Sequence, residues 1–353
     1  MAYTDIDDPS AYFQTALYTG NGGTIDVVND GNSDLQPDWL WFKCRSNNTD
    51  HGLQDSVRGT ALALQSNANS ADADVGTSQI TAFGSDGFSL AAGGDVNTNN
   101  RTYACWQWKA GTSFTNDASS TSVGTIDSAG SVNTDAGFSI ITYTGTGANG
   151  TVAHGLGVAP KMVIIKKRSG TDNWIVYHKN LSAVDRYVML DTTDGESANS
   201  AAFNDTHPTS SVFSLGSFTK SNGDGNTFVA YCFAEKQGYS KFGKYIGNGN
   251  ADGAFVYTGF KPAFIMIKFT GGDGQDWFIL DSKRSPFNLV DDSLSPSAPD
   301  AESTSEANLD FLSNGFKLKM TSVRVNANGS PYIFMAFAEN PFVTSTGTAG
   351  TAR

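Results

Sequence analysis

Short apolar runs separated by polar turn residues make up most of the chain. Runs such as "MVIIKK", "WIVYHK", "FIMIKF", "WFILDS" and "YIFMAFAE" are rich in β-branched and aromatic residues and are bounded by Gly, Asn, Asp and Ser. This pattern is typical of β-strands. No helical period of useful length occurs, and for "SANSAAFND", the nearest candidate, we expect a loop or a single turn.

The run "YIFMAFAE" is apolar at every position up to its final glutamate. Alternate residues of a strand point to opposite faces of its sheet. Here Ile333, Met335 and Phe337 form one face, and Phe334, Ala336 and Ala338 form the other. We therefore predict a central strand that is covered on both faces.

The chain repeats one pattern three times. The first copy reads "YTGNGG", "QPDWLWFK", "DGFSL" and "YACWQW"; the second "YTGTGANG", "APKMVIIK", "VFSL" and "YCFAE"; the third "YIGNGNADG", "KPAFIMIK", "NGFKL" and "MAFAE". A tryptophan follows the lysine in copies two and three, and His51 takes that place in copy one. The recurring residues are Tyr18, Gly20, Gly22, Pro37, Lys43, Tyr143, Gly145, Gly147, Pro160, Lys166, Trp174, Tyr245, Gly247, Gly249, Pro262, Lys268 and Trp277.

A period of roughly 100 residues suits similar domains and is too long for a solenoid repeat. We predict an all-β protein of three tandem homologous β-sandwich domains that are jelly-roll-like. The domains are expected at 1–111, 137–243 and 244–341. A Ser/Thr/Gly-rich linker at 112–136 and a C-terminal arm at 342–353 complete the chain.

Composition narrows the class further. The chain of 353 residues has a net charge of −12, which argues against broad nucleic-acid binding. No segment has the ~20 apolar residues of a membrane helix, and the N-terminus does not resemble a secretory signal. Three cysteines without a C-x-x-C pair argue against a disulfide framework, and we expect folding in the cytoplasm of the producing cell.

Two nucleotide-binding motifs match by spacing alone. Gly145, Gly147 and Gly150 fit G-x-G-x-x-G, but the sequence after them predicts a strand and no helix that could bind a pyrophosphate. The other copies keep Tyr-x-Gly-x-Gly and vary the third glycine, so we interpret the motif as a repeated tight bend. "GYSKFGK" fits a P-loop, but Tyr245 stands where Ser or Thr is required.

Catalytic and metal-binding patterns are equally weak. The four histidines are dispersed, with His154 and His207 in loop-like text, and Glu235 and Glu339 recur between copies, which favours a structural role. The loops "SNGDGN" and "GGDGQD" contain oxygen ligands suited to calcium, but hairpin turns use the same residues. Cys105 and Cys232 occupy equivalent positions, expected to be buried. We predict no catalytic residue, no cofactor and no metal site.

The lysine that ends each "P-x-h-h-h-h-K" strand has two interpretations. It can be a solvated strand end whose alkyl stem covers the rim of the sheet. It can also protect a sheet edge against pairing with another chain. Trp174 and Trp277 are expected in the core, although exposed loop aromatics would also suit sugar rings.

Three long motifs resemble a known family. "IDDPSAYFQTALYTGNG", "GFSIITYTGTGANGTVAHGLGVAPKM" and "YCFAEKQGYSKFGKYIGNGNADGAFVYTGFKPAF" are similar to an uncharacterised family of virion structural proteins of marine tailed phages, of the cyanophage and pelagiphage type. Members are described as tail-fibre-like or minor capsid proteins, and the resemblance covers nearly the whole chain.

The resemblance implies a non-enzymatic virion protein whose partners are capsid or tail subunits. We favour a head decoration, cement or capsid-fibre role, because long coiled-coil and β-helix repeats are absent. Three copies in one chain could lie over capsid subunits or form a pseudo-three-fold unit by themselves. The alternatives are a tail fibre or receptor-binding protein, a carbohydrate-binding module for host-surface glycans, and an envelope-degrading hydrolase.

Overall fold

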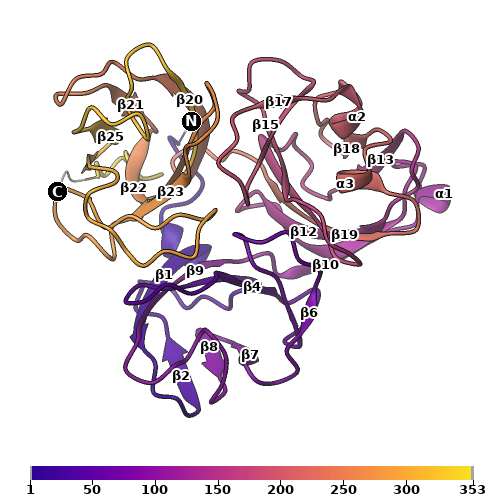
Figure 1. The fold of residues 1–353 in the computed structure, drawn as a ribbon, viewed down its shortest axis with the longest axis horizontal. Helices are drawn as coiled ribbons and strands as arrows, with labels where there is room; N and C mark the ends of the chain where they lie inside the picture. Colours follow the sequence, from indigo (N-terminus) through magenta and orange to yellow (C-terminus); the bar gives the residue numbers. More distant parts are fainter. Residues whose placement is uncertain (1, 351–353) are drawn as a thin grey trace.

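The protein, described here for residues 2–350 by a computed structural model, is almost entirely β. Strands account for 41% and helices for 4% of the residues, and the named strands pair in antiparallel sheets. The predicted all-β class is confirmed. Figure 1 shows three groups of strands, coloured indigo, magenta to pink, and orange to yellow, arranged around a common centre. We call them the first, second and third units.

The first unit contains nine strands. They are β1 (Phe13–Thr19), β2 (Ile25–Val28), β3 (Trp39–Cys44), β4 (Gly52–Asp55), β5 (Leu62–Ala63), β6 (Ala73–Asp74), β7 (Ile80–Gly84), β8 (Gly87–Leu90) and β9 (Thr102–Trp108). The large sheet has the order β1-β9-β3-β4, a second sheet has the order β2-β8-β7, and β5 pairs with β6.

The second unit contains ten strands. They are β10 (Thr112–Asn116), β11 (Ser128–Asn133), β12 (Phe138–Thr144), β13 (Gly150–Ala153), β14 (Met162–Lys167), β15 (Ile175–His178), β16 (Arg186–Met189), β17 (Ser197–Ala198), β18 (Val212–Leu215) and β19 (Thr227–Phe233). The large sheet runs β10-β11-β12-β19-β14-β15-β16-β17, and β13 pairs with β18.

The third unit contains seven strands. They are β20 (Ser240–Ile246), β21 (Phe255–Tyr257), β22 (Phe260–Phe269), β23 (Trp277–Asp281), β24 (Leu309–Leu312), β25 (Gly315–Leu318) and β26 (Pro331–Pro341). The sheets have the orders β20-β26-β22-β23 and β21-β25-β24.

The helices are single turns. They are η1 (Pro9–Ala11), α1 (Ala118–Thr121), α2 (Ser200–Phe203) and α3 (Thr219–Asn222). The turn α2 lies within "SANSAAFND", where the sequence predicted a loop or one turn. Among the residues from Ala2 to Gly350, no helix is long and apolar enough to cross a membrane.

The same strand order recurs in each large sheet. The opening strand pairs with the closing strand, which pairs with the third strand, and the fourth strand lies beyond it: β1-β9-β3-β4, β12-β19-β14-β15 and β20-β26-β22-β23. The closing strand is therefore central in each case. This explains the doubly apolar sequence of β26, whose two faces lie in different cores.

Each large sheet has two buried faces. One face packs against the small sheet of its own unit, which gives three separate cores. The opposite faces of all three sheets meet in one shared core. Its largest side chains come from every unit: Trp39, Trp41, Trp106, Trp108, Trp174, Tyr231, Phe233, Phe264, Trp277 and Phe337. Large aromatic side chains thus join the units.

The expected linker at 112–136 is not an extended connector. It forms β10, α1 and β11, which extend the large sheet of the second unit. Strand pairing uses backbone hydrogen bonds, so a Ser- and Gly-rich segment can form an edge strand that its composition does not predict. Asp117 accepts hydrogen bonds from Ser119 and Ser120 N–H and so caps α1.

The expected C-terminal arm also differs from the prediction where it is described. Residues 342–350 turn back on themselves, with Thr344 N donating to Thr348 O at 2.8 Å and Gly350 N to Phe342 O at 2.7 Å. The Ser345 N–H donates to the Asp7 carboxylate at 2.6 Å. Ser, Thr and Gly favour such turns because their side chains and φ angles suit them. Residues 351–353 of the expected arm lie outside the described residues.

Candidate functional site

The Tyr-x-Gly-x-Gly sequences form one tight turn in each unit. A Cβ on the first glycine would lie 2.3 Å from Thr98 O at Gly20, 2.4 Å from Gly223 O at Gly145 and 2.3 Å from Ala327 O at Gly247. The second glycines, Gly22, Gly147 and Gly249, have φ of +64°, +65° and +62°. Only glycine satisfies both requirements without strain. The turn leads into a strand in each unit, so these glycines shape the backbone.

The tyrosine before each turn is fixed at both ends. Its hydroxyl donates to a backbone oxygen, with Tyr18 to Val96 O at 2.6 Å, and its ring stacks on an aromatic residue of the closing strand. Tyr143 and Tyr245 make the same contacts, to Ser221 O at 2.6 Å and Val325 O at 2.7 Å.

A buried asparagine completes each turn, and sequence reasoning missed it. The side-chain oxygens of Asn97, Asn222 and Asn326 accept backbone N–H bonds of 3.0, 2.9 and 2.9 Å from the turn residues. Each asparagine precedes its closing strand by five residues, a spacing that was visible in the sequence. Asn222, which belongs to the calcium-like loop "SNGDGN", therefore holds a turn.

The recurring prolines stand at the entrance to the third strand of each large sheet. Pro37 and Pro160 lie two residues before β3 and β14, where no ladder N–H is needed. Pro262 lies within β22 at a shift in its register against β26. A proline lacks the N–H that a regular ladder uses, so a bulge is where a strand accommodates it.

Both interpretations of the three repeated lysines were wrong: none is a solvated strand end, and β3, β14 and β22 each pair with a strand on both sides, so none is a sheet edge. Lys43, Lys166 and Lys268 have only 1%, 0% and 0% of their surface exposed. Each lies near the joint between two units. The Lys166 ammonium donates to Asn69 O of the first unit at 3.2 Å, and that of Lys268 donates to Thr193 O of the second unit at 3.1 Å.

Burial also changes the acidity of these lysines. It lowers the pKa of each from 10.5 to about 8, and carboxylates near each ammonium oppose this effect in part. Carbonyl oxygens satisfy the ammonium groups, including Cys44 O for Lys43 at 2.8 Å and Lys167 O for Lys166 at 2.8 Å. Lys166 and Lys268 therefore link their strands to main-chain carbonyls of a neighbouring unit, whereas Lys43 bonds to the carbonyl of the next residue.

The side chains of Trp174 and Trp277, which follow Lys166 and Lys268, form hydrogen bonds across the same joints. The Trp174 indole N–H donates to Gln65 O of the first unit at 2.9 Å, and that of Trp277 donates to Met189 O of the second unit at 2.8 Å. His51, at the same place in copy one, contacts Ser295 O of the third unit through Nε2 at 2.9 Å. Each unit thus bonds to its neighbour in one rotational sense, and the three contacts close a ring.

The joint between the first and second units contains a buried ionic network. Arg58 Nε lies 2.6 Å from Asp55 Oδ2, and both side chains have no exposed surface. The Tyr231 hydroxyl of the second unit donates to the same carboxylate at 2.8 Å. Asp72 accepts from Arg58 at 2.9 Å and from Arg168 of the second unit at 2.7 Å.

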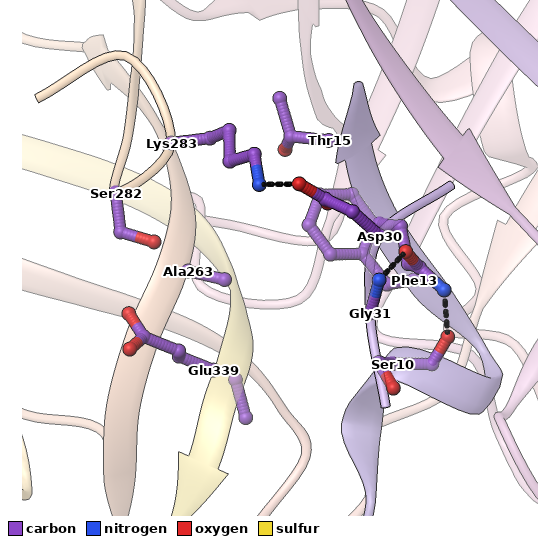
Figure 2. A pocket seen from close by; sticks show the side chains of 11 residues that line it. Ser10, Phe13, Thr15, Asp30, Gly31, Ala263, Ser282, Lys283 and Glu339 are labelled. Atoms are coloured by element: carbon purple, nitrogen blue, oxygen red, sulfur yellow. Dashed lines mark hydrogen bonds and ion pairs between the residues drawn. The ribbon is translucent and has the colours of Figure 1, made fainter. Parts of the chain in front are cut away.

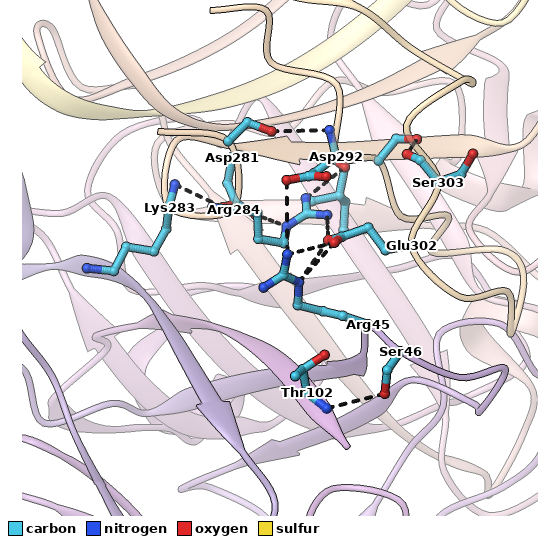
Figure 3. Close-up of polar contacts among 12 residues, drawn as sticks. Arg45, Ser46, Thr102, Asp281, Lys283, Arg284, Asp292, Glu302 and Ser303 are labelled. Carbon is cyan, nitrogen blue, oxygen red and sulfur yellow. Dashed lines mark hydrogen bonds and ion pairs between the residues drawn. The ribbon is translucent and has the colours of Figure 1, made fainter. Parts of the chain in front are cut away.

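The joint between the third and first units repeats this network (Figure 3). Arg284 Nε lies 2.5 Å from Asp281 Oδ2, which also accepts from the Trp106 indole N–H at 2.9 Å. Glu302 accepts from Arg284 at 3.0 Å and from Arg45 of the first unit at 2.7 Å. The residue types differ slightly, but each position matches its counterpart in the first joint.

The joint between the second and third units uses a mostly apolar version. His178 occupies the position that holds an aspartate in the other two joints. Leu181 occupies the position of the arginine, and Met335 that of the aromatic hydrogen-bond donor; both lie in the shared core. Burial lowers the pKa of His178 to about 4, so the ring is neutral near pH 7 and donates through Nε2 to Phe334 O at 3.2 Å. One of the three joints therefore contains no buried ion pair at the matching positions.

A hollow of about 290 Å³ lies along the joint between the third and first units (Figure 2). Phe13 and Thr15 of β1 line one side, and Ser282 and Glu339 of the third unit line the other. Lys283 spans it, with Nζ 2.5 Å from Asp30 Oδ2. Lys283 and Asp30 thus connect the two units across this hollow.

The histidines and cysteines considered from the sequence make internal contacts or are buried. His154 is buried and contacts Thr209 O at 3.2 Å, while His207 contacts the Tyr177 hydroxyl at 2.8 Å. Cys105 and Cys232 are fully buried, and burial raises the pKa of the Cys232 thiol to about 12.

The repeated glutamates and the calcium-like loop also form internal contacts. Glu235 and Glu339 pair with Lys241 and Lys261 at 2.9 and 2.8 Å. In the loop "GGDGQD", Asp273 accepts from Gly195 N at 2.9 Å. Across the described part of the chain, no three His, Cys, Asp or Glu side chains gather as metal ligands would.

These features define a class: an all-β protein whose repeated sheet units close on one another around a shared aromatic core. The chain belongs to the family described as a domain of unknown function (DUF7483), whose model matches residues 8–341. The match runs from η1 to the end of β26, so all three units together form the family's module. Comparisons with curated proteins and with solved structures find no match.

Proposed function

We propose that this protein is a non-enzymatic structural component of a tailed-phage virion, exposed on the particle as a head decoration, cement or capsid-fibre protein. In this proposal the three units are tandem jelly-roll-like β-sandwich domains, each formed by a large sheet facing a small one. The phage setting rests on the long motifs that resemble virion structural proteins.

The closed ring is the observation that carries the proposal. Equivalent positions at each joint bond to the next unit, as Trp174, Trp277 and His51 do. A ring of three similar units in one chain can offer similar edges to three neighbours, which suits a site of three-fold or six-fold symmetry in a protein lattice.

The construction of the joints also favours a rigid structural component. Large aromatic side chains fill the shared core, and buried networks such as Asp55–Arg58–Tyr231 fix how the units meet. Extensive interfaces of this kind restrict movement between units. The side chains that recur in the sequence are engaged in these contacts and in the turns.

The test is to locate the protein in purified virions of the phage that encodes it. Mass spectrometry should detect it at many copies per particle, and cryo-electron microscopy should place a three-lobed density on the head. Absence from purified particles would contradict a virion role. Density confined to the tail would contradict the head placement and support the alternative of a tail fibre or receptor-binding protein.

A further inference from the structure

A second hollow, of about 500 Å³, opens where the N-terminal segment crosses the ring. Tyr3 and Tyr12 line it together with Asp135, Lys236 and Gln237. Figure 1 marks the N-terminus beside β20 of the third unit. The hollow is therefore lined by the N-terminal segment of the first unit and by residues of the second unit.

Two aromatic rings of this hollow are held in place from behind. The Tyr3 hydroxyl donates to Gly259 O at 2.7 Å and lies 3.2 Å from the Tyr257 hydroxyl. The Tyr12 ring packs edge-on against the buried Tyr239 ring, with centroids 5.9 Å apart. Both tyrosines remain half-buried, so part of each ring faces solvent. Rings fixed in this way lose little entropy when a ligand stacks on them.

Polar groups of three kinds lie beside these rings. The main chains of Asp135, Lys236 and Gln237 are hydrogen-bonded, but within residues 2–350 their side chains form no hydrogen bond or ion pair. A carboxylate, an ammonium and an amide supply both acceptors and donors. Such a mixture of rings and polar groups is the usual lining of a small-molecule site, and 500 Å³ is within the usual size.

An exposed aromatic strand continues the surface from Tyr3. Phe255 and Tyr257 of β21 are 46% and 52% exposed, on the face opposite the core residue Val256. The positions that match them by strand pairing are Asp26 and Val28 in the first unit, and Thr151 and Ala153 in the second. The repeated fold therefore does not require aromatic residues there, and only the third unit has them.

We propose that this hollow binds a neutral pyranose sugar of a cell-surface glycan, with β21 extending the contact to a second sugar residue. A pyranose has an apolar C–H face that suits aromatic rings and a hydroxyl rim that suits Asp135, Lys236 and Gln237. The net charge of −12 disfavours anionic sugars, which selects the neutral class. The source of the glycan, though not the chemistry, rests on the proposed virion function.

Saturation-transfer NMR with the purified full chain tests the proposal. The probes are the methyl glycosides of D-glucose, D-galactose, D-mannose, N-acetyl-D-glucosamine and L-rhamnose. At least one should receive saturation, and titration of that glycoside should give a Kd. Asp135→Asn should weaken binding at least about tenfold, because the hydrogen bonds it loses are to a charged group. Tyr12→Leu should weaken it by about threefold to tenfold through loss of ring stacking.

Two substitutions serve as controls and should leave the Kd unchanged. Phe287→Ser removes another exposed aromatic residue, 79% exposed, and Asp34→Asn makes the same chemical change at another exposed carboxylate. All variants should melt at the temperature of the unaltered protein. No saturation of any of the five glycosides would overturn the proposal, as would binding that survives both site substitutions. Absence of the protein from virions would contradict its virion role and leave this result standing.

Discussion

The buried Asp281–Arg284 pair provides a quantitative test of how the ring is held together. Both side chains have no exposed surface, and Asp281 Oδ2 accepts from Arg284 at 2.5 Å and from the Trp106 indole at 2.9 Å. Asp281→Asn preserves shape and removes the charge. Arg284 keeps Glu302 and a main-chain oxygen as partners, so we expect a loss of about 3 kcal/mol, the lower end for breaking a buried pair.

Thermal unfolding followed by circular dichroism measures this loss. For a chain of 353 residues the entropy of unfolding is about 0.7 kcal/mol/K, so the expected fall in Tm is about 4 °C if the ring unfolds as one unit. Arg284→Met should cost a similar amount, because it leaves the carboxylate buried without its cation. The double variant Asp281→Asn, Arg284→Met leaves no unpaired charge, so its cost should be at least about 2 kcal/mol below the sum of the two single costs.

An exposed pair in the same unit is the matched control. Lys317 lies 2.5 Å from Asp252, whose side chain is 75% exposed. Asp252→Asn should cost less than about 1 kcal/mol, because solvent screens that pair. If the Asp281 and Arg284 costs simply added, or if Asp281→Asn behaved like Asp252→Asn, the inference that a desolvated, coupled pair joins the units would be refuted.

Three further predictions follow from burial and backbone geometry. The three repeated lysines have a pKa of about 8 in the folded protein, against an ordinary value of 10.5. Between these two values the folded state binds fewer protons than the unfolded state, so the free energy of unfolding should rise with pH from 7 to 9.5. Replacing all three with Met should flatten that rise in Tm; a slope equal to the parent's would contradict the assignment. Gly247→Ala should lower the free energy of unfolding by more than about 2 kcal/mol in denaturant titration, because its Cβ would lie 2.3 Å from a main-chain oxygen, whereas Gly23→Ala should be nearly neutral. Cys105 and Cys232, fully buried with raised thiol pKa values, should react with a thiol reagent at pH 8 only after denaturation, and rapid labelling of the folded protein would show that these cores open.

The fold was largely predictable because its signals are local. Apolar runs and repeated landmarks predicted strands, and the alternation in "YIFMAFAE" predicted a central strand buried on both sides, which β26 confirms. The G-x-G-x-x-G motif is not followed by a helix in the sequence, which predicted a tight bend, and Gly145 and Gly147 lie in one. Each of these inferences needs only residues that are neighbours in sequence or in the repeat.

Features that depend on contacts between units were not predictable in this way. Lys166 ends its strand as a solvated lysine would, yet it is buried, and its ammonium donates to Asn69 O of another unit. The segment 112–136 has the composition of a linker and becomes part of a sheet through pairing with β12. Asp135, Lys236 and Gln237 of the second hollow lie in polar sequence without a recognisable motif, and they line one hollow only in the folded protein.

The unequal joints suggest how one arrangement of the ring is specified. Short connections join the first unit to the second and the second to the third, whereas the third meets the first only through non-covalent contacts. Both joints of the first unit contain a buried aspartate–arginine network, and the remaining joint has His178 with Leu181. Hydrophobic burial is non-directional, so an aromatic core alone would accept the first unit in several orientations. Buried ion pairs disfavour the misaligned ones because each would leave a desolvated charge without its partner. On this argument the networks of the first unit set the direction in which the ring closes, and the shared core provides most of its stability.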